Sequence, residues 1–367
     1  MRGELVVFAT RSMEDYAERV AFEMQTFPDF YGKGYSSSIR GRLKTITFAD
    51  GEIEVEVHTS IRGKDVFLFA SAARNADGLS VEQNKMELYH AIDAIRRSQP
   101  ARITLFEPFC TASRSDRTTR RNSVGFWVHY KTLTSLGVDH IITYQLHSDK
   151  SKTVVDPRIC AIDDVPGSPL IMEYITDTYV RKPDVLNDAV RRDWLFCSVD
   201  AGGENAARKY ARAFGTRLMI AHKQRNYDKA NTVEAVNILT DTDITGKEIW
   251  IVDDMIDTAG SVYTLAQELK KRGVGRVNVA AIHPVFSDPA TARLQELYDD
   301  GILDRLVVTD TLDVSQAIHD AMPFLEVVPS ARLSAEIVMR MHEEQSLSPF
   351  FDDFDPRHYL SNLKLFL

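Results

Sequence analysis

Two neighbouring acids, Asp253 and Asp254, stand at the end of the apolar run Ile249–Val252, and small residues follow them. Carboxylates in this position can accept hydrogen bonds from hydroxyl groups or hold a divalent cation. The stretch from Asp257 to Ser261 leads into a helical pattern, and a helix N-terminus offers free N–H groups to an anion. The segment therefore predicts a site for a phosphorylated compound that carries hydroxyl groups. A helix cap and turn is the plainer alternative.

A second loop of this kind contains Asp200, Gly202 and Gly203, between the strand pattern Trp194–Ser198 and the helix pattern Gly203–Phe214. The two glycines let the backbone approach a diphosphate, and Asp200 can reach Mg²⁺ from the same loop. A strand-to-helix turn without ligand remains the alternative.

Two cations, Lys223 and Arg225, follow the strand pattern Arg217–Ala221 in a polar segment that ends near Thr232. Two residues apart in an extended loop, they share a face. Such a pair can stabilise a transferring phosphoryl group electrostatically, which is most of the catalysis in that chemistry. A solvated basic loop is the alternative.

The first half of the chain holds three further candidates. The residues Asp50, Gly51 and Glu52 join two strand patterns and read alone as a hairpin turn. A basic run that opens with Arg114 and Ser115 follows a strand and can clamp a triphosphate, or can be a solvated charge run. His147 closes another strand and suits a metal, although a lone histidine there is more often structural.

The elements that position these residues alternate between apolar strands and amphipathic helices, which predicts an α/β fold with mostly parallel sheet. At 367 residues the chain is long enough for two domains. We expect the boundary between Lys150 and Ser168, where prolines and a glycine interrupt the pattern. Phe27–Arg42 is expected to be an exposed insertion, and the aromatic tail Leu347–Leu367 to dock on a neighbouring subunit or to fray.

The predicted elements are listed by half. In the first, strands are expected at 5–8, 44–48, 53–57, 66–70, 103–107 and 140–144, and helices at 12–24, 82–98 and 125–136. In the second, strands are expected at 194–198, 217–221, 234–239, 249–252, 276–282 and 304–308, and helices at 169–179, 203–214, 261–272, 289–299 and 330–344.

Composition excludes several classes. The net charge of −9 argues against general nucleic-acid binding. No apolar stretch is long enough to span a membrane, and no signal-peptide pattern opens the chain. The three cysteines are scattered and odd in number, so neither a disulfide framework nor a zinc knuckle is expected. The cytoplasm is the expected compartment.

The loop at Asp253–Ser261 resembles that of type I phosphoribosyltransferase folds, and phosphate plus hydroxyls suits a ribose 5-phosphate. Taken in order, the segments resemble the ribose-phosphate pyrophosphokinase family, which makes 5-phosphoribosyl 1-pyrophosphate (PRPP). The landmarks are Phe48–Glu52, Ser60–Val66, Met86–Leu88, the Lys223/Arg225 pair, Val252–Ser261 and His283–Ser287.

The resemblance implies two type I phosphoribosyltransferase-like domains, each a mostly parallel sheet flanked by helices. Residues 1–163 would contribute to ATP binding and oligomer contacts, 164–346 would carry the ribose 5-phosphate, diphosphate and catalytic loops, and 347–367 would form a tail. It implies diphosphoryl transfer from ATP to ribose 5-phosphate with Mg²⁺, giving PRPP and AMP for nucleotide biosynthesis. It also implies a dimer-based homo-oligomer such as a hexamer, with the active site completed across an interface.

The same resemblance assigns roles to particular residues. Lys223 and Arg225 would be catalytic, and His147 and Asp200 would bind Mg²⁺. ATP would be bound by Asp50, Gly51, Glu52, Arg114 and Ser115. Ribose 5-phosphate would be bound by Arg225, Asp253, Asp254, Asp257, Thr258, Ala259, Gly260 and Ser261.

The chain departs from the family pattern at Ser115, Thr118, Gln145 and Ala201. Two other readings therefore stay open. One is a non-catalytic regulatory subunit related to the synthetases. The other is a phosphoribosyltransferase that consumes PRPP, although such an enzyme needs only one α/β half.

Overall fold

The computed structural model describes residues 3–28, 30–33, 35, 39–73, 78–118, 121–225 and 233–363. The chain forms two compact units. The first consists of Met1–Pro166 and Pro329–Phe351, and the second of Gly167–Val328 and Asp352–Leu367. None of the helices among the described residues combines the length and apolar character that crossing a bilayer requires.

The first unit is built on a five-stranded parallel sheet in the order β1-β4-β5-β6-β7. These strands are β1 (Leu5–Ala9), β4 (Asp65–Phe69), β5 (Arg102–Phe106), β6 (His140–Tyr144) and β7 (Ala161–Val165). A separate antiparallel hairpin consists of β2 (Leu43–Thr47) and β3 (Ile53–Val57).

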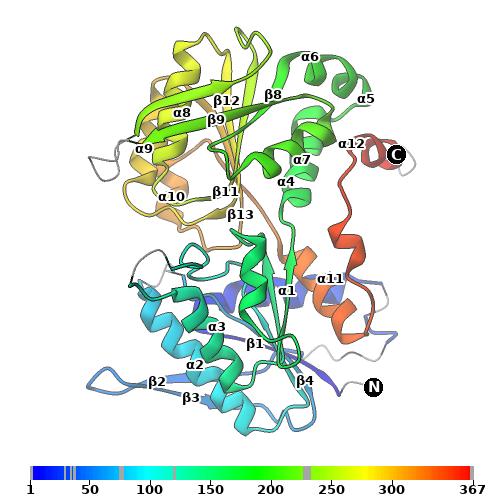
Figure 1. The fold of residues 1–367 in the computed structure, drawn as a ribbon. Helices are drawn as coiled ribbons and strands as arrows, with labels where there is room; N and C mark the ends of the chain where they lie inside the picture. The colour runs from blue at the N-terminus through cyan, green and yellow to red at the C-terminus, as the bar shows by residue number, and fades with distance from the viewer. Residues whose placement is uncertain are drawn as a thin grey trace. The chain divides into compact units, whose positions relative to one another are not determined.

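Helices cover both faces of the first sheet (Figure 1). They are α1 (Glu14–Thr26), α2 (Val81–Arg97), α3 (Gly125–Leu136) and α11 (Ala331–His342), with shorter helical turns at Arg11–Met13, Asp149–Val154 and Ser348–Phe351. The alternation along β1 sorts its side chains between the faces: Val7 packs with α1 and α11, whereas Val6 and Phe8 pack with α2 and α3.

The second unit contains a seven-stranded sheet in the order β10-β9-β8-β11-β12-β13-β14, in which only β10 runs antiparallel to its neighbour. Its strands are β8 (Trp194–Ser198), β9 (Arg217–Arg225), β10 (Val233–Leu239), β11 (Glu248–Ile256), β12 (Arg276–Pro284), β13 (Leu303–Thr309) and β14 (Leu325–Val328).

Two helical layers cover this second sheet as well. Its helices are α4 (Ser168–Ile175), α5 (Pro183–Val185), α6 (Arg191–Asp193), α7 (Glu204–Phe214), α8 (Gly260–Lys271), α9 (Ala290–Asp299), α10 (Gln316–Ala321) and α12 (Pro356–Leu363), with π-helical turns at Thr176–Val180 and Leu186–Val190. Helices α8 and α9 share one core with the sheet, and α4 and α7 share the other.

Apart from the edge strand β10 of the second sheet, the two sheets have the same strand order once one short segment of the first is counted. Arg40 forms a parallel bridge to Val7 on the free edge of β1, with hydrogen bonds from the Val7 N–H to Ile39 O and from the Gly41 N–H to Val7 O, both 2.8 Å. From β1 the chain moves outward by this one segment before it reverses direction, whereas from β8 it moves outward by two strands, β9 and β10, before it does so. The reversal lies between β1 and β4 in the first unit, and between β8 and β11 in the second. Ligands of open α/β sheets bind at such switch points.

The structure corrects two expectations about organisation. Phe27–Arg42 is not simply an exposed insertion, because Phe30 and Ile39 are buried in the core shared with α1 and α11. Residues 329–346, expected in the second domain, belong instead to the first unit, because α11 packs on α1. The Tyr16 hydroxyl makes 2.7 Å hydrogen bonds with the hydroxyls of Ser330 and Ser334.

The expected tail at 347–367 is also divided by the structure. Its first part, up to Phe351, lies with the first unit, and the rest lies with the second. Leu360 of α12 is buried in the core that contains α4 and α7, and the Tyr359 hydroxyl donates to Asp177 at 2.7 Å. The described part of the tail is docked on its own chain.

Candidate functional site

The loop after β8 is shaped by Asp200. Its Oδ1 accepts the backbone N–H groups of Gly202 at 2.9 Å and Gly203 at 3.1 Å, immediately before α7 begins. The glycine-containing loop predicted from the sequence is thus a tight turn that leads into a helix N-terminus. The turn holds the Asp200 side chain at the second unit's switch point, where its oxygens can serve as ligands of a cation.

The two acids of the neighbouring strand lie within β11, not beyond it, because that strand continues to Ile256. The Asp253 Oδ1 accepts the N–H of Asp254 at 2.9 Å. Burial, then the charge of Asp254 and, more weakly, that of Asp200 raise the pKa of Asp253 well above its usual value. Three carboxylates from two adjacent strands therefore influence one another at the switch point, a charge distribution that suits a bound cation or sugar hydroxyls.

The segment after β11 turns sharply into α8. Ala259 has a left-handed backbone with φ of 57°, and α8 begins at Gly260 with no side-chain cap. The N–H groups of its first turn therefore have no partner within the helix. Thr258 is exposed and Asp257 partly buried. The structure brings together the predicted pentose-phosphate residues of this segment on one strand end and one helix start.

Lys223 and Arg225 were expected on a loop, but the structure places them at the end of β9. There Lys223 pairs with Val236 and Arg225 with Val233 across the antiparallel ladder with β10. Pairing with β10, the next strand along the chain, extends β9 beyond the predicted range 217–221. The rest of the predicted polar segment, 226–232, lies outside the described residues.

In the first unit, Arg114 is exposed on the segment that follows β5. Ser115 next to it is bound to the start of α3: its Oγ accepts the Gly125 N–H at 3.0 Å, and its carbonyl accepts the Phe126 N–H at 3.1 Å. Ser115 is thus engaged in fixing the backbone beside Arg114. Its assignment as an ATP ligand stays a prediction.

A buried polar cluster fixes the other end of that segment. The Tyr130 hydroxyl of α3 donates to Glu107 at 2.9 Å, and His129 lies 3.5 Å from the same carboxylate. Burial alone would raise the pKa of Glu107, but the charge of His129 and hydrogen bonds from His129, Tyr130 and Thr111 outweigh it and lower the pKa. Helix α3 therefore holds the Arg114 segment on both sides.

His147 is exposed beyond the end of β6, next to β5 in the first sheet. The preceding residue is tethered, because the N–H of Leu146 donates to Asp164 Oδ1 at 2.9 Å. Burial raises the pKa of Asp164, partly offset by the Leu146 N–H and Lys152. His147 belongs to the first unit and Asp200 to the second, so their pairing as metal ligands remains a prediction.

The carboxylate oxygens at the second switch point suit Mg²⁺, which leaves positions to water and substrate, better than a metal ion held by protein ligands alone. Within the described ranges, no cluster of three or more histidine, cysteine or acidic side chains is placed to hold a metal ion. Mg²⁺ keeps several waters and binds through one or two carboxylates together with substrate phosphates. Asp200 on its turn, beside Asp253, fits that mode of binding.

The hairpin β2–β3 carries the three predicted ATP residues at its tip. Asp50, Gly51 and Glu52 are all exposed, and Gly51 has a φ of 93°, which the turn requires of a glycine. The Asp50 Oδ1 accepts the Glu52 N–H at 3.1 Å. The structure confirms a tight hairpin turn here, and the tip is free to contact a ligand or another chain.

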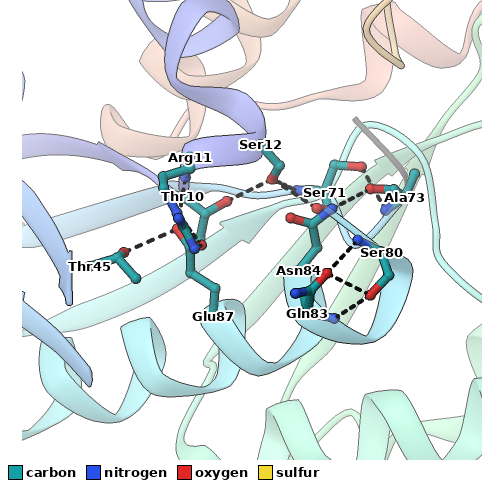
Figure 2. A network of polar contacts seen from close by, with 10 residues as sticks. All are labelled: Thr10, Arg11, Ser12, Thr45, Ser71, Ala73, Ser80, Gln83, Asn84 and Glu87. Carbon is teal, nitrogen blue, oxygen red and sulfur yellow. Dashed lines mark hydrogen bonds and ion pairs between the residues drawn. The ribbon is translucent and has the colours of Figure 1, made fainter. Parts of the chain in front are cut away.

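The switch point of the first unit is closed by a network of the protein's own polar groups (Figure 2). Glu87 of α2 accepts the Arg11 N–H at 2.9 Å, the Arg11 guanidinium and the Thr45 hydroxyl of the hairpin at 3.2 Å. The Ser12 hydroxyl donates to Ser71 O at 2.8 Å, which joins the ends of β1 and β4.

The two switch points therefore differ electrostatically. In the first unit the buried carboxylate of Glu87 faces the cation of Arg11. In the second unit, Asp253 faces two other carboxylates. The first switch point thus holds a carboxylate paired with a cation, whereas the second holds carboxylates that influence one another, which favours the second as a candidate ligand site.

Two layered α/β units, with acidic and small-residue loops at the second switch point, define a phosphoribosyltransferase-like protein. A family model described as the N-terminal domain of ribose phosphate pyrophosphokinase matches residues 5–137, and one described as the phosphoribosyl synthetase-associated domain matches residues 209–352. The ribose-phosphate pyrophosphokinase of Chlorobaculum tepidum is 34% identical over 363 residues, 99% of both chains.

Two further relatives agree. Ribose-phosphate pyrophosphokinase 1 of Streptococcus pneumoniae is 33% identical over 351 residues, 95% of this chain and 98% of its own. The crystal structure of phosphoribosylpyrophosphate synthetase from Mycobacterium smegmatis matches with a TM-score of 0.77 and 28% identity, over 93% of this chain and 99% of that one. The chain belongs to the ribose-phosphate pyrophosphokinase family, and is accordingly an enzyme of the diphosphotransferase class.

Sequence reasoning missed the residues that support the site from other elements. Glu107, His129 and Asp164 stand in ordinary strand and helix patterns, and their contacts become visible only when those elements pack. The one signal for these residues in the sequence is Glu107 itself, an acid that follows the apolar strand residues Leu105 and Phe106.

Proposed function

We propose that the protein transfers the β,γ-diphosphoryl group of ATP to the C1 hydroxyl of ribose 5-phosphate, giving PRPP and AMP. The anomeric oxygen forms a bond to the β-phosphorus, the bond from that phosphorus to the oxygen bridging it to the α-phosphate breaks, and the hydroxyl proton is released. The observation that carries the proposal is the acidic second switch point, where Asp200, Asp253 and Asp254 lie beside the uncapped start of α8.

Each part of that site has a task in this chemistry. The carboxylates of Asp253 and Asp254 accept the ribose hydroxyls, and Asp257 through Ser261 bind the 5-phosphate at the N-terminus of α8. Lys223 and Arg225 stabilise the charge that develops on the transferred group. Asp50, Gly51, Glu52, Arg114 and Ser115 bind ATP. These residue roles extend the family assignment to particular side chains.

The metal proposed is Mg²⁺, with Asp200 and His147 as its protein ligands. When bound, Mg²⁺ neutralises phosphate charge and polarises the transferred group. The protein's own contribution is to hold the Asp200 carboxylate rigidly, through the N–H groups of Gly202 and Gly203. We also propose that the protein acts as a homo-oligomer built from dimers.

The deciding experiment is the formation of AMP from ATP, Mg²⁺ and ribose 5-phosphate, with and without inorganic phosphate. Production of AMP and PRPP in equal amounts is expected. No AMP under any phosphate concentration would favour a regulatory subunit instead. Release of diphosphate from PRPP and a nucleobase without ATP would favour a phosphoribosyltransferase.

A further inference from the structure

Arg293, on α9, reaches across to the segment that connects β11 to α8. Its Nη1 donates a 2.8 Å hydrogen bond to the carbonyl oxygen of Thr258. Helix α9 follows β12 and lies more than thirty positions along the chain from that segment, outside every motif found in the sequence. The contact joins a cation from one element to the loop where the proposed function places a phosphate.

The start of α8 is fitted to this side chain. A Cβ added at Gly260 would lie 3.2 Å from Arg293 Nη1, closer than ordinary van der Waals contact. Gly260 does not have a left-handed backbone, so its φ alone does not demand glycine. A side chain at this position would instead push the guanidinium aside by a few tenths of an ångström.

Electrostatics give that guanidinium a task. Three acids, Asp253, Asp254 and Asp257, lie on or just before the loop, whereas a sugar phosphate brings a further negative charge. Arg293 makes no ion pair within the described part of the chain, and its hydrogen bond is to a neutral carbonyl. Its charge is therefore not cancelled by a carboxylate of its own and counteracts the acidic surroundings of an arriving phosphate.

We propose that Arg293 is a positioning residue of the pentose-phosphate loop. It fixes the peptide at Thr258, and so the geometry of the first turn of α8, and it supplies positive charge beside the bound 5-phosphate. This inference rests on the proposed function, because it takes ribose 5-phosphate to be the ligand of that loop. It assigns a role to a residue outside the loop and predicts an effect on one substrate only.

The test compares Arg293→Met with Lys270→Met. Lys270 of α8 is a matched control because its Nζ also donates to a backbone carbonyl, Gly301 O at 3.0 Å, away from the loop. In Arg293→Met the KM for ribose 5-phosphate should rise roughly tenfold, the size expected for one hydrogen bond to a charged group. The KM for ATP should stay within about twofold, and Lys270→Met should change neither value by more than that.

Two further readouts separate positioning from general stability. Arg293→Lys, which keeps the charge but not the planar fork, should recover part of the affinity. Added KCl should raise the wild-type KM for ribose 5-phosphate more steeply than that of Arg293→Met, because salt screens a charge that only the wild type has. Equal changes in both substrates' KM values, or none in Arg293→Met, would overturn the proposal.

Calorimetric titration with ribose 5-phosphate alone distinguishes this inference from the proposed function. If the wild type binds the sugar phosphate and Arg293→Met binds it about tenfold more weakly, Arg293 acts as proposed even if no AMP is formed. If the wild type forms AMP and both proteins bind the sugar phosphate equally, the function stands and the role of Arg293 is refuted.

Discussion

The carboxylate of Glu87 receives both the backbone N–H and the guanidinium of Arg11, with Nε–Oε2 at 2.7 Å (Figure 2). Glu87 is almost completely buried, whereas the Arg11 side chain is nearly half exposed. The same carboxylate also binds Thr45 on the β2–β3 hairpin. One acid thus joins the end of β1, helix α2 and the hairpin that carries Asp50 and Glu52.

Replacing Glu87 by Gln should destabilise the first unit by about 2 kcal/mol, because a buried charge-assisted hydrogen bond is lost while the shape is kept. Urea unfolding would measure the change. Glu82→Gln on the same helix is the control, since its pair with Lys85 is exposed and should be worth less than about 1 kcal/mol. Equal losses in the two variants would contradict the role assigned to Glu87.

The contribution of Asp253 to the free energy of unfolding should fall as the pH rises. Its pKa is raised by burial and by Asp254 and Asp200, so the folded protein holds its proton more tightly than the unfolded chain. That stabilisation is complete below about pH 4 and is lost as the pH rises through the raised pKa. Asp253→Asn should therefore unfold a few degrees higher than the wild type at pH 8, by roughly 2–4 °C.

Calorimetric scans without ligand, at pH 4 and pH 8, would check this, and the difference between the proteins should shrink toward pH 4. The same variant should bind ribose 5-phosphate more weakly, because the Asp253 carboxylate is proposed to accept the ribose hydroxyls. A site that gathers like charges for binding costs stability in the free protein. A variant less stable than the wild type at pH 8 would contradict the prediction.

The cysteines should resist thiol reagents in the native protein. Cys110, Cys160 and Cys197 are all buried and free. Burial raises the pKa of Cys110 well above its usual value, and raises the pKa of Cys160 and of Cys197 to about 12. The reactive thiolate is therefore scarce at pH 8. A colorimetric thiol assay should count no fast-reacting cysteine before denaturation and three after it; a fast native thiol would disprove this.

Lys223→Ala should lower kcat by about 10²-fold or more while leaving ribose 5-phosphate binding almost unchanged, because the proposed contact forms only in the transition state. Quenched-flow AMP formation and calorimetry measure the two quantities separately. Lys209→Ala, an exposed cation on α7, is the control and should behave as wild type. Parallel losses in binding and rate would place Lys223 in ground-state binding instead.

The sequence was a good guide wherever the signal was local. The apolar run before Asp253 predicted a buried strand, and the small residues after it predicted a helix start; both are found, with the strand one residue longer at its start and four residues longer at its end than expected. The alternation of Val6, Val7 and Phe8 also predicted a strand, but only the packed helices show which core each residue enters.

What could not be predicted depends on pairings between separate elements, some of them neighbours along the chain and some distant. The strand at Lys223 exists because β10 pairs with it, and α11 joins the first unit because Tyr16 and Tyr144 both bind the hydroxyl of Ser334. These contacts connect residues up to 318 positions apart. Arg293 is the clearest case for function, since nothing in its own helix indicates that its guanidinium meets Thr258.

Gly260→Ala gives the sharpest test of the contact between Arg293 and Thr258, because binding should weaken while stability does not fall. Alanine favours a helix over glycine by up to about 1 kcal/mol, so the variant should be no less stable. Its Cβ, however, would lie 3.2 Å from Arg293 Nη1 and displace the guanidinium by a few tenths of an ångström.

The KM for ribose 5-phosphate should therefore rise roughly two- to fivefold, since small misplacements of binding groups weaken a preorganised site. In a protein that already carries Arg293→Met, adding Gly260→Ala should have little further effect, because the group it displaces is gone. Contacting residues in such cycles couple by at least about 0.5 kcal/mol. If the two effects simply add, the glycine and the arginine act independently, and the fit between α8 and α9 is not what shapes the loop.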